Sequence, residues 1–413
     1  MFTYQNNVFH AEHVALSDIA DQYGTPCYVY SKAAFTQHFK AYTGAFGDHP
    51  HLVAYAVKAN SNLAVLQVLA QLGAGFDIVS RGELERVLAA GGQPERIVFS
   101  GVAKTVEEIE RALTVGIHCF NVESVAELER IDAVARRMNT VAPVSLRVNP
   151  NVDAQTHPYI STGLKENKFG IDIDLAFDVI TNMQTDALRW KGVDCHIGSQ
   201  LTETQPFLDA MDLVLALVDR LSAAGVALSH IDMGGGLGVC YNDEQPPAVS
   251  DYIGAMLARL GERQLSVVLE PGRSIAANAG VFLTSVEYLK RNGDKHFAIV
   301  DGAMNDLIRP SLYSAWMAIQ AVTPHENGTA AQFDVVGPVC ETGDFLGKDR
   351  LLNLTPGDVL AVKGAGAYGF VMASNYNSRP KVCEIMVDGD QHQVIRERET
   401  LAQLWQGEHL LKG

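Results

Sequence analysis

The sequence predicts an α/β protein in which a (β/α)8 barrel of the TIM type is joined to a mainly β domain. Eight short apolar segments alternate with helical patterns over ~230 residues, an alternation typical of a closed parallel barrel. After about residue 281, short apolar runs are separated by Gly, Pro, Asn and Asp, and helical periodicity becomes sparse. A doubly wound open sheet is the alternative architecture for the first part.

The barrel strands are expected at eight segments, residues 53–57, 76–79, 97–99, 117–122, 144–148, 192–197, 230–233 and 267–269. The first is apolar throughout, as a parallel strand covered on both faces is. Helical patterns lie between the strands, at residues 62–72, 83–90, 106–113, 125–138, 207–224 and 252–260. Thr105 with Glu108, and Ser124 with Glu127, have the spacing of a capping box at a helix start.

The mainly β domain is expected to combine both ends of the chain. Its strands are predicted at residues 282–286, 297–300, 332–336, 359–362, 382–387 and 393–395, with one helix at 399–405. A further strand-like run, residues 27–30, precedes the first long helical pattern. We therefore expect residues 34–280 to form the barrel, and residues 1–33 and 281–413 to form the β-rich domain.

Composition limits the possible partners of this chain of 413 residues. Its formal net charge of −16, without a basic block, makes it a poor candidate for nucleic acid or an anionic membrane. No apolar run is long enough to span a bilayer, and the first residues lack a signal-peptide pattern. The six cysteines are scattered without a C-x-x-C pair. We therefore expect a cytoplasmic protein without a metal site or a disulfide framework.

Lys58 directly follows the first predicted barrel strand. Functional side chains of barrel enzymes lie at the C-terminal ends of the strands, so Lys58 is in the right place for catalysis. Partial desolvation there can free the amine for Schiff-base chemistry. On its position alone, a lysine that extends into solvent is the more common alternative.

Further polar and glycine residues follow other predicted strands. The run from Gly234 to Gly236 can turn backbone N–H groups toward an anion, although such runs are more often plain turns. Glu270 follows the eighth strand, where a buried carboxylate needs a cationic partner such as a protonated ring nitrogen or Arg273. His196 can stack on a flat ring or serve as a hydrogen-bonded structural residue. Asp77 and Ser199 also lie at strand ends.

The second domain contributes candidates with less specific signals. Cys340 stands next to Glu341, and a thiol can donate a proton to a carbanion, although a buried inert cysteine is the ordinary interpretation. Arg309 and Tyr313 offer a guanidinium and a phenol suited to a carboxylate, or a solvated loop. Tyr368 lies in a glycine-rich turn and can reach a phosphate or pack. Together, a lysine nucleophile, an anion cradle, a carboxylate for a ring nitrogen and an aromatic stacker are what pyridoxal phosphate needs.

The order of six motifs resembles the pyridoxal-phosphate decarboxylases of the alanine-racemase fold type. The motifs are Tyr-Ala-Val-Lys-Ala-Asn, His-Ile-Gly-Ser-Gln, Gly-Gly-Gly, Glu-Pro-Gly-Arg, Cys-Glu-Thr-Gly-Asp and Gly-Ala-Tyr-Gly. Within that group, residues 301–313, 336–344 and 368–377 resemble the diaminopimelate decarboxylases. The resemblance as a whole covers almost the entire chain. The resemblance implies a barrel plus a β domain, pyridoxal 5'-phosphate as cofactor, and a homodimer with active sites at its interface.

The resemblance also implies roles for individual residues. Lys58 matches the lysine that carries the cofactor, and Cys340 matches the acid that protonates the carbanion after loss of CO2. The other matched cofactor contacts are Asp77, His196 as ring stacker, Ser199, Gly235, Gly236, Glu270 on the pyridine nitrogen, Gly272, Arg273 and Tyr368. The matched substrate contacts are Arg273, Arg309, Tyr313, Glu341 and Tyr368, with Cys340 and Glu341 supplied across the dimer interface.

The implied reaction converts meso-diaminopimelate to L-lysine and CO2, the last step of lysine biosynthesis. Three alternatives stay open. The first is a decarboxylase of the same fold for ornithine, lysine, arginine or carboxynorspermidine, in which acids are expected where Arg309 stands. The second is an alanine-racemase-like enzyme, which has an arginine rather than Glu270 near the pyridine nitrogen. The third is a non-catalytic pyridoxal-phosphate carrier or regulator, which is expected to lack the β domain, Lys58 or Cys340.

Overall fold

The computed structural model describes residues 1–152 and 167–412. By its internal contacts the chain divides into two compact units. The first comprises Met1–Phe35, Tyr241–Asp243 and Ala276–Gly413, and the second comprises Thr36–Cys240 and Glu244–Ile275. The predicted domain boundaries, after residues 33 and 280, stay a prediction about which parts of the chain fold as separate domains.

The second unit is a closed barrel of eight parallel strands, as the sequence predicts. Its strands are β5 (His51–Ala56), β6 (Gly75–Ile78), β7 (Ile97–Phe99), β8 (Cys119–Val122), β9 (Ala142–Asn149), β11 (Leu188–Asp194), β12 (His230–Asp232) and β13 (Ser266–Leu269). Each pairs with the next, and β13 pairs in parallel with β5, which closes the barrel. The two-residue strand β10 (Ile171–Asp172) adds to β9. This closure excludes the open doubly wound sheet.

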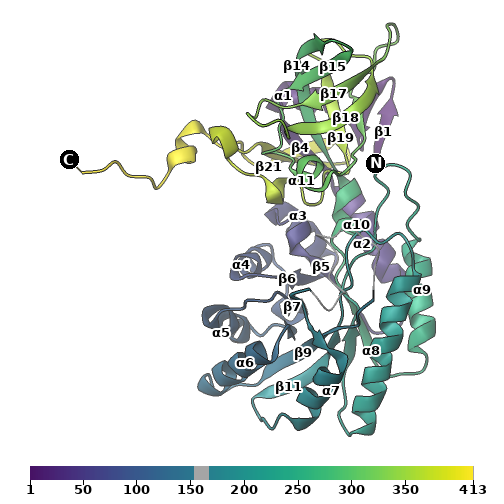
Figure 1. Cartoon of the computed structure of the whole chain (residues 1–413), viewed down its shortest axis with the longest axis vertical. Coiled ribbons are helices and arrows are strands. Elements are labelled where there is room, and N and C mark those ends of the chain that lie inside the picture. The colour runs from purple at the N-terminus through teal and green to yellow at the C-terminus, as the bar shows by residue number, and fades with distance from the viewer. Residues whose placement is uncertain (153–166, 413) are drawn as a thin grey trace. The chain divides into compact units, whose positions relative to one another are not determined.

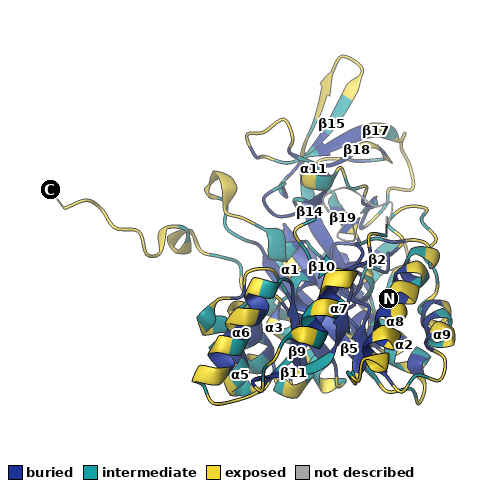
Figure 2. Cartoon of the chain, turned by 60° about the horizontal axis from the view of Figure 1, so that its bottom comes forward, coloured by how far each residue is buried: buried dark blue, intermediate teal, exposed yellow. Residues whose placement is uncertain are grey.

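Helices surround the barrel strands (Figure 1). They are α2 (Lys32–Phe46), α3 (Leu63–Gln71), α4 (Arg81–Ala89), α5 (Val106–Val115), α6 (Val125–Arg137), α7 (Ile173–Asn182), α8 (Gln205–Ala223), α9 (Val249–Leu260) and the short α10 (Arg273–Ala276). Figure 2 shows the two-sided character of helices such as α6, α8 and α9, with buried residues toward the strands and exposed residues outward. The longer helices therefore cover the outer face of the barrel with an apolar stripe.

Side-chain caps start several of these helices. Thr105 and Glu108 form the predicted capping box at α5. At α6 only half of the predicted box forms: the Ser124 hydroxyl accepts from the Glu127 N–H. The Glu127 carboxylate instead accepts from Lys104 Nζ at 2.7 Å, in a pair whose side chains are 1% and 5% exposed. A buried ammonium requires a counter-charge, so Glu127 is held by Lys104.

The first unit is mainly β. A sheet of nine strands has β18 (Phe345–Leu352), β17 (Ala331–Val336), β15 (Lys295–Val300), β14 (Gly280–Asn292), β4 (Cys27–Ser31), β20 (Cys383–Asp388) and β21 (Gln391–Arg396) in that order. Strand β19 (Val359–Lys363) pairs with β14 and with β16 (Ile319–Ala321). N-terminal strand β4 pairs with β14 and β20, so the chain's start and its last third share one sheet.

The same unit contains elements that the sequence patterns did not predict. The N-terminus forms a small sheet of β1 (Phe2–Gln5), β2 (Val8–Ala11) and β3 (Val14–Ala15), followed by α1 (Leu16–Tyr23). Strands β16 and β18 are also unpredicted, and so is helix α7 of the barrel. The helix expected at 399–405 is wrong in type, because Leu401–Trp405 forms a 3-10 helix.

Candidate active site

Lys58 lies immediately after β5, in a 3-10 turn formed by Val57–Ala59. Its Nζ donates to Asp77 Oδ2 at 2.7 Å, and the Asp77 side chain is fully buried on the neighbouring strand β6. The register that pairs Ala56 with Asp77 brings the two together. The other oxygen, Asp77 Oδ1, is buried and has no hydrogen-bond partner among the described residues. A buried carboxylate oxygen without a donor marks a place where a ligand is expected to contribute one.

Glu270, just after β13, is joined to a network in the barrel interior. Its Oε1 accepts from Asn121 Nδ2 at 3.1 Å and from the Ser100 hydroxyl at 3.3 Å. Asn121 Nδ2 also donates to Asp232 Oδ2 at 3.1 Å, and Asp232 Oδ1 accepts from the Gly234 N–H. The amide of Asn121 therefore bridges the two carboxyl groups.

Burial and mutual repulsion raise the pKa values of these acids. The pKa of Glu270 lies well above its usual value, because of burial and then because Asp232, Asp77 and Asp194 stand nearby. Burial raises the pKa of Asp232 to about 6. Such a cluster of carboxyl groups favours a cationic ligand, since a positive charge would let the acids ionise.

Arg147 supplies the buried positive charge of the same interior. Its Nη1 donates to Glu123 Oε1 at 2.8 Å, and its Nε lies 3.9 Å from Asp194 Oδ2. The guanidinium therefore offsets part of the negative charge of Glu123 and Asp194. Arg147 Nη2 also donates to the His196 carbonyl at 3.5 Å, which connects this pair to the loop after β11.

The glycine run after β12 approaches the neighbouring backbone too closely for any side chain. A Cβ on Gly235 would lie 2.3 Å from the Glu270 carbonyl oxygen, and one on Gly236 would lie 2.6 Å from the Gly198 carbonyl oxygen. Gly236 also has φ 111°, which L residues rarely adopt. The Gly235 N–H donates to His196 Nδ1 at 3.1 Å, which orients the imidazole. Burial lowers the pKa of His196 well below its usual value, so its ring is neutral.

Arg273 begins α10 and reaches back to the loop after β11. Its Nε and Nη2 donate to the Ser199 hydroxyl at 3.2 and 3.0 Å, and the residue is 7% exposed. A Cβ on Gly272 would contact the methyl groups of Ala56 and Ala59 at 3.0 and 3.1 Å. Glycine at 272 therefore lets this segment pack against the turn that carries Lys58.

The barrel thus gathers one set of predicted residues at the C-terminal ends of its strands: Lys58, Asp77, His196, Ser199, Gly235, Gly236, Glu270, Gly272 and Arg273. These residues fit a flat cofactor that carries both an anionic group and a positively charged ring. They supply an amine, a tight glycine turn with an arginine for an anionic group, a flat neutral ring, and buried carboxyl groups for a ring cation. The unsatisfied Asp77 oxygen is consistent with a ligand of this kind.

The β-rich unit carries the remaining predicted residues. Arg309 and Tyr313 are the first and last residues of the short helix α11 (Arg309–Tyr313). The Arg309 guanidinium lies over the Tyr241 ring at 4.6 Å, and the residue is 6% exposed. Stacking on an aromatic ring holds a guanidinium in one plane, which suits it to a carboxylate.

Cys340 and Glu341 lie on a loop between β17 and β18, and both are exposed. The Cys340 N–H donates to Asn377 Oδ1 at 2.9 Å, and Glu341 Oε1 accepts from the Tyr376 hydroxyl at 2.5 Å. The loop is joined to α11, because the Ser311 hydroxyl donates to the Gly343 carbonyl at 2.6 Å. The expectation of an inert buried cysteine does not apply to Cys340.

Tyr368 lies apart in sequence, in the turn after β19, with φ 55°. A tyrosine in the left-handed region is uncommon, and strained residues of this kind gather at functional sites. A Cβ on Gly366 would lie 2.0 Å from the Ala276 carbonyl oxygen, so the turn is packed tightly against the segment that precedes β14. The turn that carries Tyr368 is therefore tightly packed.

Sequence reasoning missed several members of these networks. In the barrel they are Ser100, Asn121, Glu123, Asp194 and Asp232, and in the β-rich unit they are Tyr241, Tyr376 and Asn377. One signal was available for the first group: polar residues inside otherwise apolar strands, such as Asn121 between Phe120 and Val122. The second group has no comparable signal, because tyrosine and asparagine are ordinary loop residues.

A closed barrel with this constellation at its strand ends defines a pyridoxal-phosphate-dependent enzyme of the barrel type. The sequence matches the family described as "Pyridoxal-dependent decarboxylase, pyridoxal binding domain" over residues 32–277. It is 62% identical to the diaminopimelate decarboxylase of Pseudomonas aeruginosa over 411 residues, 99% of each chain. The chain therefore belongs to the diaminopimelate decarboxylase family.

Further relatives support this family membership. The Vibrio cholerae diaminopimelate decarboxylase is 58% identical over 413 residues, 99% of each chain. The crystal structure of diaminopimelate decarboxylase from Helicobacter pylori complexed with L-lysine superposes with a TM-score of 0.91, at 45% identity and with 95% and 98% of the two chains covered. The predicted fold, enzyme class and pyridoxal 5'-phosphate cofactor are confirmed by these family relationships. Over residues 1–152 and 167–412, no helix combines the length and apolarity needed to cross a membrane.

Proposed function

We propose that this chain removes CO2 from meso-2,6-diaminopimelate, at its D centre, and releases L-lysine. The observation that carries the proposal is the Lys58–Asp77 pair beside the buried Glu270 cluster, in a chain that shares its full length with diaminopimelate decarboxylases. When bound, pyridoxal 5'-phosphate supplies the electron sink for the carbon that loses CO2.

The residues of the barrel bind and orient the cofactor. Lys58 would hold it through its amine, which Asp77 keeps in place by a hydrogen bond. The glycine turn at Gly235 and Gly236, with Arg273, would receive its phosphate, and His196, which the Gly235 N–H orients, would lie against the ring. Glu270 would pair with the ring nitrogen and keep it protonated, which would strengthen the electron sink.

The residues of the β-rich unit recognise the substrate and return a proton. The Cys340 thiol donates the proton to the carbon that has lost CO2. The far end of meso-diaminopimelate carries an ammonium and a carboxylate, which suit Glu341 and Arg309 respectively, with Tyr313 and Tyr368 alongside. A substrate without the distal carboxylate leaves an arginine unpaired and is rejected.

The first test is CO2 release by cofactor-loaded protein. We expect release from meso-diaminopimelate, with L-lysine as product. L-lysine, L-ornithine, L-arginine and carboxynorspermidine should react roughly 10⁴-fold more slowly, the discrimination typical of a site whose polar groups would be left unpaired. Faster release from a basic amino acid would overturn the roles of Arg309 and Glu341. Cofactor binding without release from any of them would favour a carrier or regulator.

We also propose that the enzyme works as a homodimer in which Cys340 and Glu341 serve the partner's barrel. Both residues are exposed, and their hydrogen-bond partners Asn377 and Tyr376 are exposed as well. Leu312 and Trp316, at and just beyond α11, leave 44% and 42% of their surface exposed. Exposed apolar side chains next to functional polar residues are typical of a subunit interface.

Mixing two inactive variants tests this arrangement. Lys58→Ala and Cys340→Ala should each lose turnover alone. After joint refolding or co-expression, random pairing makes about half of the dimers mixed, and each mixed dimer has one intact site of two, so roughly a quarter of wild-type activity should return. Activity that stays at the level of the single variants, in a verified mixed dimer, would place Lys58 and Cys340 of one site in the same chain.

The cytoplasm is the proposed location. All six cysteines are free thiols, including the neighbours Cys27 and Cys383, which face each other across the β4–β20 pairing. Free thiols are typical of a reducing compartment.

A further inference from the structure

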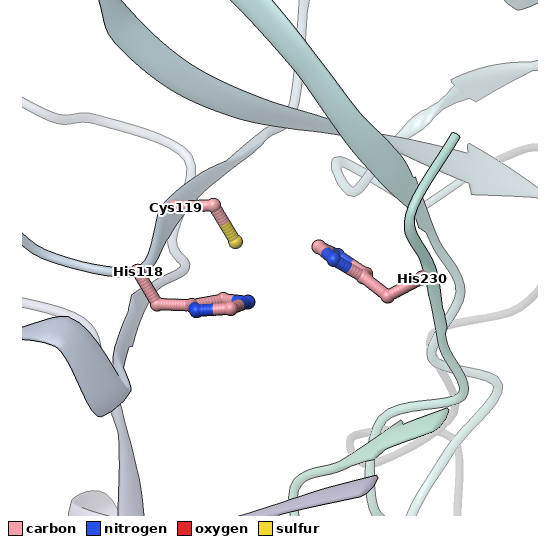
Figure 3. A group of neighbouring side chains, drawn as sticks. All are labelled: His118, Cys119 and His230. Carbon is pink, nitrogen blue, oxygen red and sulfur yellow. The ribbon is translucent and has the colours of Figure 1, made fainter. Parts of the chain in front are cut away.

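Three potential metal ligands meet at the end of the barrel opposite the candidate active site. His118 directly precedes β8, Cys119 is the first residue of β8, and His230 is the first residue of β12. Strands β9 and β11 separate β8 from β12 in the barrel order, so the group reaches across the N-terminal end of the barrel. Figure 3 shows the two imidazole rings and the thiol turned toward one another.

The ligand atoms are close to the spacing of a bound ion. One nitrogen of each ring and Cys119 Sγ all lie within 4.8 Å of one another. With Zn–N near 2.0 Å and Zn–S near 2.3 Å, ligand atoms of a tetrahedral site stand about 3.5 Å apart. Small side-chain rotations would therefore bring these atoms around one ion.

The environment of the His230 ring points to a bound ligand. The residue is 1% exposed, and both ring nitrogens are buried without a hydrogen-bond partner among the described residues. Burying a polar ring with no partner is costly, so such a group calls for an explanation. Its place in the barrel is also specific: a Cβ on Gly192 would lie 2.5 Å from His230 Cδ2 and 2.6 Å from Nε2. Glycine at 192, next to an irregularity in the β9–β11 pairing, leaves room for the ring.

His118 is arranged as metal-bound histidines usually are. Its Nδ1 lies 3.2 Å from the Glu95 carbonyl oxygen, to which it donates as the Nδ1–H tautomer. A hydrogen bond from one ring nitrogen to a carbonyl orients the other for an ion. His118 is also only half-buried, which gives an ion access from solvent.

We propose that His118, Cys119 and His230 bind one late first-row divalent ion, Zn²⁺ foremost, which fastens β8 to β12 at the N-terminal end of the barrel. Two imidazoles and a thiolate select Zn²⁺ and its neighbours over Mg²⁺ and Ca²⁺, which prefer oxygen ligands. Solvent supplies the fourth ligand. The role is structural, since catalysis in barrels takes place at the other end.

Charged residues around the three ligands affect how tightly they can bind a divalent ion. Burial lowers the pKa of His118, and lowers that of His230 to about 3, so both rings are neutral with lone pairs available. Lys191 stands near both histidines and Arg96 near His118, and these cations oppose an incoming ion. Burial raises the pKa of the Cys119 thiol, and the nearby acids Asp232, Asp194 and Glu270 raise it further. The thiol must lose its proton on binding, whereas the same acids favour an incoming cation.

The test uses the cofactor-loaded full chain, stripped of metal with a chelator and titrated with Co²⁺ and then Zn²⁺. We expect one Co²⁺ per chain, with the thiolate-to-cobalt charge-transfer absorption and the intense visible bands of tetrahedral geometry, and displacement by Zn²⁺. Bound Zn²⁺ should raise the melting temperature by mass action. No thiolate band at saturating Co²⁺ would overturn the proposal.

Three variants assign the ion to these side chains. Cys119→Ser should abolish the thiolate band, and a band that persists would place the ion at another cysteine. His118→Gln, at a half-buried position, should weaken Co²⁺ binding at least ~10-fold while decarboxylation continues. His51→Gln is the matched control, because His51 also begins a barrel strand and its Nδ1 lies 2.7 Å from the His49 carbonyl oxygen. Equal Co²⁺ affinity in His118→Gln and His51→Gln would refute the site.

Discussion

Replacing Lys58 with alanine is expected to lower turnover by more than ~10³-fold, because the variant lacks the amine that we propose holds the cofactor covalently. The absorption of the covalently held cofactor should disappear. In the wild-type protein, borohydride reduction followed by peptide mapping should place the cofactor on residue 58. Retention of the absorption in Lys58→Ala, or mapping to another lysine, would remove Lys58 from this role.

A second substitution separates chemistry from structure at the same position. Lys58→Ala also leaves the buried Asp77 carboxylate without its ammonium partner, so some loss of stability is expected. Lys58→Arg keeps a cation beside Asp77 but offers no nucleophilic amine. Turnover should therefore be lost in Lys58→Arg while its melting temperature stays close to that of the wild type. Lys32→Ala, which breaks an exposed pair with Asp388, is the surface control and should leave turnover near wild type.

Glu270→Gln is expected to lower kcat by about 10²–10³-fold, the range seen when one preorganised electrostatic partner is removed. Glutamine keeps the shape of the side chain and a hydrogen bond to Asn121, but it cannot carry the negative charge that keeps a ring nitrogen protonated. Steady-state kinetics together with cofactor titration checks this. A variant that binds the cofactor well but turns over slowly is the expected result, and wild-type kcat would contradict the role of Glu270.

The stability of the cofactor-free protein offers an independent readout for Glu270. Its pKa in the fold lies well above the usual 4.5, because of burial and the neighbouring acids. An acid whose pKa rises on folding binds protons more tightly in the native state, so stability falls as pH rises from about 4.5 toward the folded-state pKa. Glu270→Gln removes this contribution. The variant should therefore lose less stability than the wild type over that pH range.

The matched control for Glu270→Gln is the same change at Glu127, a buried carboxylate that accepts from Lys104. Removing that charge leaves Lys104 buried without its counter-ion and should lower the melting temperature. Turnover should fall far less than in Glu270→Gln, since Glu127 lies on helix α6 and is linked to Asn121 through Lys104, whose Nζ donates to the Asn121 backbone carbonyl at 2.7 Å. Equal losses of kcat in both variants would mean that any buried charge change impairs the enzyme through folding.

The sequence patterns were most informative where a structural element is specified locally. All eight barrel strands appear where apolar runs predict them, because a parallel strand buried on both faces must be apolar along its length. Strand β18 was not predicted, because its middle consists of Gly347, Lys348, Asp349 and Arg350. It also pairs with β17 through register shifts. Its polar middle does not alternate, so no period of two is visible in the sequence.

Residue patterns alone indicate the barrel, the β-rich part and the motifs that resemble pyridoxal-phosphate decarboxylases, including Lys58 after the first barrel strand. Which of these side chains meet depends on how the strands pair in the folded chain. Asp77 pairs with Lys58 because β5 and β6 are in register, and Asn121 bridges Asp232 and Glu270 across the barrel interior. His118 and Cys119 meet His230 for the same reason, although more than a hundred residues separate them. Strand register and barrel closure fix these distances through space, and no local pattern of residues encodes them.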